Sequence, residues 1–141
     1  MKQFDSKRAE RERIEDVSRE FKEELIDAGI IDFDKISYRC CGRHITELKF
    51  GDHFQMYELL LADVVELKPT AEQELKFKKI MADDSTQYRF TTAEQIACLG
   101  MDIEAEALYE WIGDHTKKIL QENENQLIKI PGTGKIFSVD L

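Results

Sequence analysis

The residue types best suited to metal or thiol chemistry gather in one short stretch of the sequence. Cys40 and Cys41 are adjacent, His44 follows them closely, and His53 comes soon after. Cysteine and histidine are the ordinary ligands of zinc. Adjacent residues of a strand point to opposite faces, however, and the two cysteines lack the Cys-x-x-Cys spacing of a zinc knuckle. We therefore expect no metal and no other cofactor, and these four residues stay only as metal-site candidates.

The same stretch offers one thiol that could act as a nucleophile. Arg43 and His44 follow Cys41 closely, and cationic neighbours lower the pKa of a thiol. No part of the sequence indicates an oxyanion site or a substrate pocket to accompany it. We expect no catalytic residue and a protein that is not an enzyme, with a Cys/His metal-binding protein or thiol enzyme or sensor as the alternative.

A second candidate motif covers residues 90–112, where two predicted helices flank a glycine turn in the manner of a helix-turn-helix. The would-be recognition helix carries three carboxylates and no arginine or lysine before Lys117. A helix that enters the major groove needs donors for bases and cations for phosphates. We therefore expect no direct nucleic-acid binding, and an acidic helix-turn-helix-like regulator is a further alternative. The three carboxylates, which we assign instead to a protein-binding surface, are Glu104, Glu106 and Glu110.

Carboxylates are densest in the N-terminal part of the chain, and the formal net charge is −9. An acidic surface favours basic partners and disfavours phosphates. We expect this segment to bind a basic protein surface, although a merely solvated helix face, or a homodimer formed through its apolar stripe, would fit the same pattern. The residues assigned to the surface are Glu15, Asp16, Glu20, Glu23, Glu24 and Asp27.

Helical periodicity and capping signals predict the elements that position these residues. Apolar residues at steps of three and four predict a helix over about 6–28, which Gly29 would end. Residues 53–68 fit a helix better than a strand. Thr70 and Thr92 each begin a Thr-Ala-Glu-Gln string, which is typical of a capping box at a helix start. Asp102 is expected to cap a helix that runs to about 123.

Alternating patterns predict two small β elements, one near 35–50 and a C-terminal hairpin at 127–139 whose turn contains Pro131, Gly132 and Gly134. The predicted fold is α+β and mainly helical, with four or five helices. The 141 residues are expected to form a single domain, 1–141. Trp111 is expected to anchor its core, because it shares the apolar stripe of the helix expected after Asp102.

The chain has no apolar run of the roughly 18 residues that a membrane span needs, and no signal peptide is recognisable. Three cysteines, an odd number, favour reduced thiols and a cytoplasmic location. Taken together, the patterns predict a small non-enzymatic acidic adaptor or inhibitor that binds a protein partner and no membrane. Proteins of this kind are often encoded by phages or plasmids.

Overall fold

The computed structural model describes residues 14, 16–46, 49–51, 56–58, 61–83, 85–102, 104–108 and 110–141, with the backbone alone at 49–51 and 56–58. The chain divides into two compact units. The first unit comprises Met1–Cys41, Val65–Asp84 and Ile130–Leu141, and the second comprises Gly42–Val64 and Ser85–Lys129. The single-domain organisation stays a prediction.

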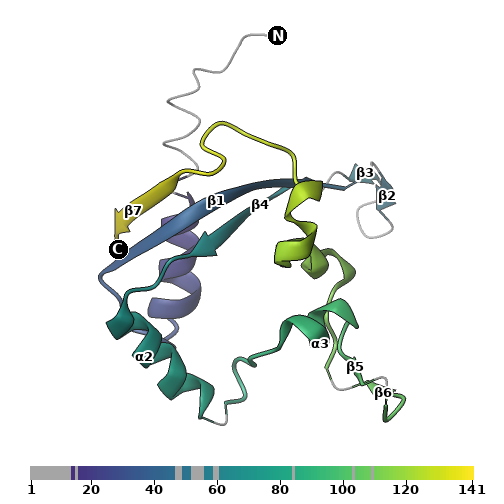
Figure 1. The fold of residues 1–141 in the computed structure, drawn as a ribbon, viewed down its shortest axis with the longest axis horizontal. Helices are drawn as coiled ribbons and strands as arrows, with labels where there is room; N and C mark the ends of the chain where they lie inside the picture. The colour runs from purple at the N-terminus through teal and green to yellow at the C-terminus, as the bar shows by residue number, and fades with distance from the viewer. Residues whose placement is uncertain are drawn as a thin grey trace. The chain divides into compact units, whose positions relative to one another are not determined.

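A three-stranded sheet contains β1 (Lys35–Ile45), β4 (Leu61–Leu67) and β7 (Ile136–Asp140), in the order β4-β1-β7 (Figure 1). β1 and β7 are antiparallel, and Lys35 lies opposite Asp140. Side chains alternate between the faces of a strand, and Ile36, Tyr38 and Cys40 are all buried. β1 is therefore the central strand, and its even-numbered residues supply the core.

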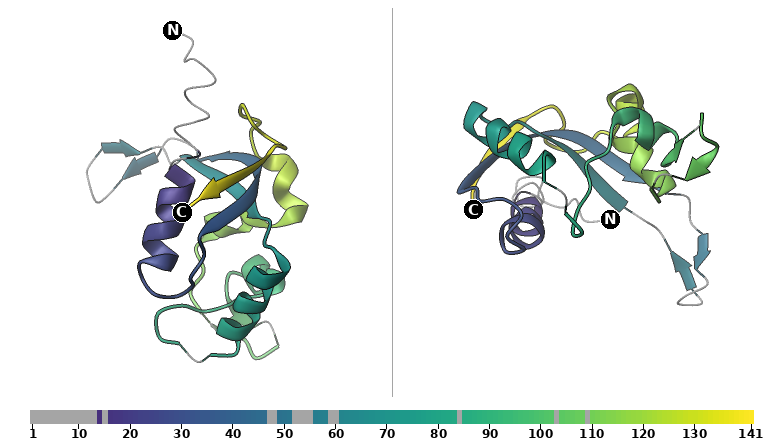
Figure 2. Two further views of the ribbon diagram at one scale, coloured as in Figure 1. Left: turned by 90° about the vertical axis from the view of Figure 1, so that its left-hand side faces the viewer. Right: turned by 90° about the horizontal axis from the view of Figure 1, so that it is seen from below.

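The core of the first unit lies between the N-terminal helix and one face of β1 and β7 (Figure 2). Ile36 is 1% exposed, and the ring centroids of Phe33 and Phe77 lie 5.4 Å apart in an edge-to-face arrangement. Such aromatic pairs contribute about 0.5–1.5 kcal/mol beyond the area they bury. Helix residues Val17, Phe21 and Leu25 pack against the same cluster.

The N-terminal helix changes its winding partway along. Residues 16–21 are α-helical, and Lys22–Ile26 form the π-helical segment η1, in which the amide of Asp27 donates to the carbonyl of Lys22 over 2.8 Å. Gly29 follows with φ of 73°, a left-handed conformation that glycine adopts without strain. The predicted stop at Gly29 is confirmed, whereas residues 6–13 of the predicted helix lie outside the described residues.

Both predicted capping boxes are confirmed. The side chain of Thr70 accepts from the amide of Gln73 at the start of α2 (Ala71–Met81), and Gln73 reaches back to the amide of Thr70. Thr92 and Gln95 repeat this arrangement at α3 (Ala93–Ala97). Each box satisfies two backbone donors that a helix start would otherwise leave unpaired.

The described part of the second unit is built from α3 and several other short elements. β2 (Lys49–Gly51) pairs with β3 (Met56–Glu58), and β5 (Met101–Asp102) pairs with β6 (Ala107–Leu108). Two 3₁₀ helices follow, η2 (Asp114–Ile119) and η3 (Gln121–Gln126). Ile96, Leu120 and Leu127 are its buried apolar residues among those described.

The prediction of a mainly helical fold was wrong. Residues 56–58 and 61–67 are strands, β3 and β4, where a helix was favoured. Val65 and Leu67 pack against the core while Glu66 between them is exposed. Pairing with β1 and the burial of alternate residues therefore override the helical spacing of the apolar residues.

The helix expected from Asp102 to about 123 does not form. The carboxylate of Asp102 accepts from the amides of Glu104 and Ala105, so it closes a turn between β5 and β6. Glu106 has a positive φ of 49°, and Gly113 lies in an extended conformation just before η2. Local side-chain hydrogen bonds of this kind compete with a helix for the backbone donors.

The predicted C-terminal hairpin was also wrong, although its turn exists. Residues 131–134 do turn, with the amide of Lys135 donating to the carbonyl of Gly132 over 2.9 Å. β7 then pairs with β1, and Ile128 forms a bridge with Arg43 instead. Long-range pairing with the central strand satisfies more backbone groups than a local hairpin would.

Trp111 does not anchor the core. Its side chain is 81% exposed, and Leu108 and Ile119, from the same expected stripe, are 52% and 56% exposed. The apolar stripe was inferred from residue spacing on the assumption of a helix after Asp102. Because that helix does not form, the residues of the stripe lie on different elements. Among the described residues, no helix has the length and apolar character that a membrane crossing requires.

Candidate functional site

Three glutamates share the solvent-facing side of the N-terminal helix. Glu20, Glu23 and Glu24 are all exposed, whereas the opposite side packs into the core. Residues three and four apart lie on the same face of a helix. The burial of the apolar side therefore fixes the helix and presents a row of carboxylates to solvent.

The π-helical segment η1 contains two of these glutamates, Glu23 and Glu24. Turns of this kind are rare and occur often at functional sites, because the extra residue in the turn redirects side chains. The turn is closed at its C-terminal end, where the amides of Ile30 and Ile31 both donate to the carbonyl of Leu25. The backbone thus holds the carboxylate-bearing turn in one defined conformation.

Carboxylate oxygens are the ligands that hard divalent cations prefer. Among the described residues, no three histidine, cysteine, aspartate or glutamate side chains come together in a group that could hold a metal ion. Mg²⁺ is usually bound through one or two carboxylates together with waters and substrate phosphates. The donor chemistry of Glu20, Glu23 and Glu24 therefore fits a cation that is completed by a phosphate ligand.

The other carboxylates assigned to this helix are less available or differently placed. Asp16 pairs with Arg19 over 3.3 Å, and Asp27 follows the π-helical segment. Glu15 lies outside the described residues. Asp16 and Asp27 are exposed too, and Glu20, Glu23 and Glu24 are the neighbouring carboxylates between them on the described helix.

The described part of the structure does not bring the metal-site candidates together. Cys40 and Cys41 are buried cysteines of β1 that form no disulfide, and the thiol of Cys41 donates to the carbonyl oxygen of Arg39 over 3.8 Å. His44 is half-buried farther along the same strand, and His53 lies outside the described residues. The buried thiols are part of the strand's packing.

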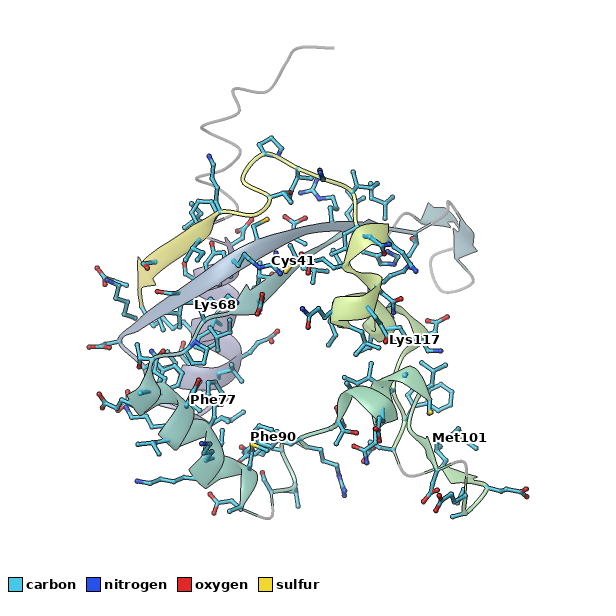
Figure 3. All side chains as sticks on the ribbon, in the orientation of Figure 1. Cys41, Lys68, Phe77, Phe90, Met101 and Lys117 are labelled. Carbon is cyan, nitrogen blue, oxygen red and sulfur yellow. The ribbon has the colours of Figure 1, made fainter. Side chains whose placement is uncertain are left out.

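The second carboxylate group lies around the β5–β6 turn and not on a recognition helix. Glu104 and Glu106 are exposed in the turn, and Glu110 pairs with Arg89 over 3.0 Å. Met101, opposite Leu108 in this hairpin, is labelled in Figure 3. The helix-turn-helix arrangement is therefore absent from the described part of this segment.

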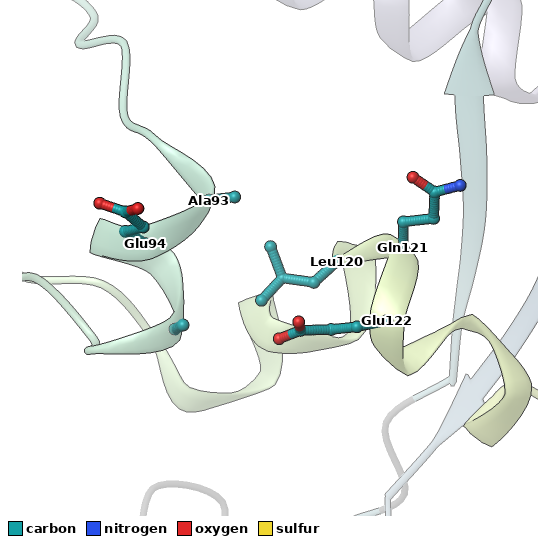
Figure 4. Close-up of a pocket in the computed structure, with 6 residues that line it drawn as sticks. Ala93, Glu94, Leu120, Gln121 and Glu122 are labelled. Carbon is teal, nitrogen blue, oxygen red and sulfur yellow. The ribbon is translucent and has the colours of Figure 1, made fainter.

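A cavity of about 500 Å³ lies in the second unit, beside α3, η2 and η3. It is lined on one side by residues of α3 and on the other by Leu120 and the start of η3, as Figure 4 shows: Ala93, Glu94, Ala97, Leu120, Gln121 and Glu122. Figure 4 shows Leu120 extending toward α3. No pattern in the sequence signals this cavity, because the part of its wall at Gln121 and Glu122 was expected to be the end of the helix that begins after Asp102.

A charged group lies on the sheet of the first unit, away from the core side. Glu66 accepts from Lys68 over 2.6 Å and from Arg39 over 2.9 Å (Lys68 is labelled in Figure 3). These hydrogen bonds, Lys68 first and Arg39 second, hold the pKa of Glu66 below its usual 4.5. Glu66 therefore serves as a structural partner of two cations.

The sequence analysis placed Glu20, Glu23 and Glu24 on a protein-binding surface, which stays a prediction, and did not consider them as cation ligands. The available signal was the run Arg19-Glu20-Phe21-Lys22-Glu23-Glu24, in which carboxylates recur at helical spacing on the polar side of an amphipathic helix. The π-helical winding could not be read from this run, because it depends on backbone pairing beyond the helix.

Residues 1–120 match the family model described as SMODS-associated NUDIX domain. Comparisons with curated proteins and with solved structures gave no match. The family match overturns the prediction of a non-enzymatic acidic adaptor or inhibitor of phage or plasmid type. It also overturns both alternatives, the Cys/His metal or thiol protein and the helix-turn-helix regulator.

Proposed function

The chain belongs to the SMODS-associated NUDIX domain family, and we propose that it is a NUDIX-like, hydrolase-related domain that acts on a phosphoanhydride, such as the diphosphate of a nucleotide derivative. The observation that carries the proposal is the family match, which spans residues 1–120 and includes the acidic helix. The carboxylate row on that helix supplies chemistry that suits phosphate hydrolysis.

In this proposal, Glu20, Glu23 and Glu24 face the phosphates of the substrate. Their exposure leaves them open to a ligand, and the packing of Val17, Phe21 and Leu25 keeps the helix in place beneath them. One or two carboxylates of this row, together with the substrate phosphates, would hold a divalent cation, which would supply Lewis acidity toward the phosphate oxygens. A carboxylate of this row that is left without a cation can accept a proton from water.

The proposal is tested by turnover of a panel of nucleoside triphosphates, dinucleotides and nucleoside diphosphate sugars in the presence of Mg²⁺. We expect one class to be hydrolysed, and we expect Glu23→Gln and Glu24→Gln to lower kcat/KM by about 100-fold or more. Glutamine has nearly the helix propensity of glutamate, so the fold should persist.

Glu74→Gln is the matched control, because Glu74 is an exposed glutamate on α2. It should hydrolyse substrate as the parent does. Full activity of both helix variants would contradict the assignment of Glu23 and Glu24, and absence of hydrolysis across the panel would contradict the proposed function itself.

A further inference from the structure

A second cavity, of about 410 Å³, lies in the first unit where β1, α2 and β7 meet. Its volume falls within the range of roughly 300–1,000 Å³ that is typical of small-molecule sites. Its lining includes Phe33 and Ile36, which are 5% and 1% exposed, together with polar side chains from all three elements. Because Phe33 and Ile36 are almost fully buried, the side chains on the wall that a ligand could reach are mainly polar.

The polar wall is fixed by hydrogen bonds between the elements. The amide nitrogen of Gln73 donates to the carbonyl of Lys35 over 2.6 Å, and its oxygen accepts from the amide of Thr70. The hydroxyls of Ser37 and Ser138 lie 2.7 Å apart and join β1 to β7. A wall that is already ordered loses little conformational freedom when a ligand binds.

Lys76 is also held in place at this cavity. Its ammonium donates to the carbonyl of Asp32 over 2.9 Å and lies 5.6 Å from the centroid of the Phe33 ring. Two lysines and two acidic residues contribute to the lining, so its formal charges cancel. A strongly charged ligand would therefore gain little from the cavity as a whole. The four charged lining residues are Asp34, Lys35, Glu72 and Lys76.

Hydroxyl groups suit this mixture of donors and acceptors best, because each one both donates and accepts. The bond between Ser37 and Ser138 leaves a hydroxyl proton and further lone pairs for a ligand. The carboxylates of Asp34 and Glu72, which also line the cavity, can accept hydrogen bonds from further hydroxyl groups. We infer that this cavity binds a neutral polyhydroxylated ligand, a sugar ring of pentose or hexose size.

The sugar could be free or could be the ribose of a nucleoside, and the two sources share the same hydroxyl chemistry. The inference does not depend on the proposed function, since the cavity and the acidic helix face are separate sets of residues. Sugar binding and hydrolysis can therefore fail independently in experiments.

The test is a titration of the ¹⁵N-labelled full chain with D-ribose, D-glucose and adenosine, followed by the amide resonances of Ser37, Gln73 and Ser138. We expect these resonances to shift, with a Kd of about 1 mM, a typical weak affinity. Tighter binding of adenosine than of ribose would identify a nucleoside as the source, and equal or tighter binding of a free sugar would identify the sugar itself.

Ser138→Val tests the site, because it removes the hydroxyl, adds methyl groups at the cavity and keeps a residue that favours strands. It should weaken binding about tenfold or more, whereas Thr86→Val, which removes the hydroxyl of an exposed threonine in the other unit, should leave the affinity unchanged. The inference is overturned if none of the three ligands shifts these resonances, if Ser138→Val binds as the parent does, or if inorganic phosphate binds there more tightly than ribose.

Discussion

At the scale of single residues, Glu66 shows how two cations stabilise an exposed carboxylate. Lys68 and Arg39 both donate to it, and these bonds lower its pKa in the folded chain. A carboxylate with a lowered folded pKa contributes stability that is fully present above its unfolded pKa and is lost as the pH falls through the folded value. The unfolded value is close to the usual 4.5.

We therefore expect Glu66→Gln to lower the melting temperature at pH 7 and to have no effect well below the folded pKa of Glu66. The measurement is the melting temperature of parent and variant by circular dichroism, from neutral pH to below pH 4.5. A difference that persists unchanged at the acidic end would contradict this account of the ion pairs.

Trp111 offers a second residue-scale test, because it is the chain's single tryptophan and is 81% exposed. Trp111→Ala should change the free energy of unfolding by no more than about 0.5 kcal/mol, as for other surface positions. Ile36→Ala, at a side chain that is 1% exposed, should cost about 2–5 kcal/mol. Urea denaturation followed by circular dichroism measures both. A Trp111→Ala loss as large as that of Ile36→Ala would show that the indole is buried.

At the scale of elements, short-range signals were predictable and long-range pairing was not. The capping boxes at Thr70 and Thr92 depend on residues within one turn, so the sequence predicted both helix starts. The strands β4 and β7 depend on pairing with β1 across many residues, and local periodicity indicated a helix and a hairpin in their place. The acidic helix face was predictable from spacing, but the role that we propose for it was not, because exposed carboxylates are as typical of binding surfaces as of cation sites.

The capping boxes provide a prediction at this scale. Thr92→Ala removes the side chain that accepts from the amide of Gln95, and the loss of such a cap costs about 1 kcal/mol. Thr91→Ala is the neighbouring control, because Thr91 is exposed and lies just outside the cap. The urea midpoint should fall for Thr92→Ala alone. Equal midpoints for the two variants would mean that the capping bond contributes nothing to stability.

At the scale of the whole molecule, the net charge of −9 misled the functional prediction. Acidity lowers the general affinity for phosphates, yet the family match places the chain among NUDIX domains. A local arrangement of carboxylates can bind phosphate through a shared cation even where the overall charge repels it. Net charge is thus evidence about solubility and association. For predicting function it carries less weight than the chemistry of a defined group of side chains.

The measurement that tests the central claim most directly is turnover of the parent protein in ¹⁸O-labelled water, with the products followed by mass spectrometry. A hydrolase uses water as a substrate, so we expect one labelled oxygen atom in one phosphate-containing product for each phosphoanhydride bond that is cleaved. Incorporation should depend on the protein and should fall with Glu23→Gln and Glu24→Gln. Cleavage without label in either product, or no cleavage of any phosphoanhydride in the panel, would contradict the account.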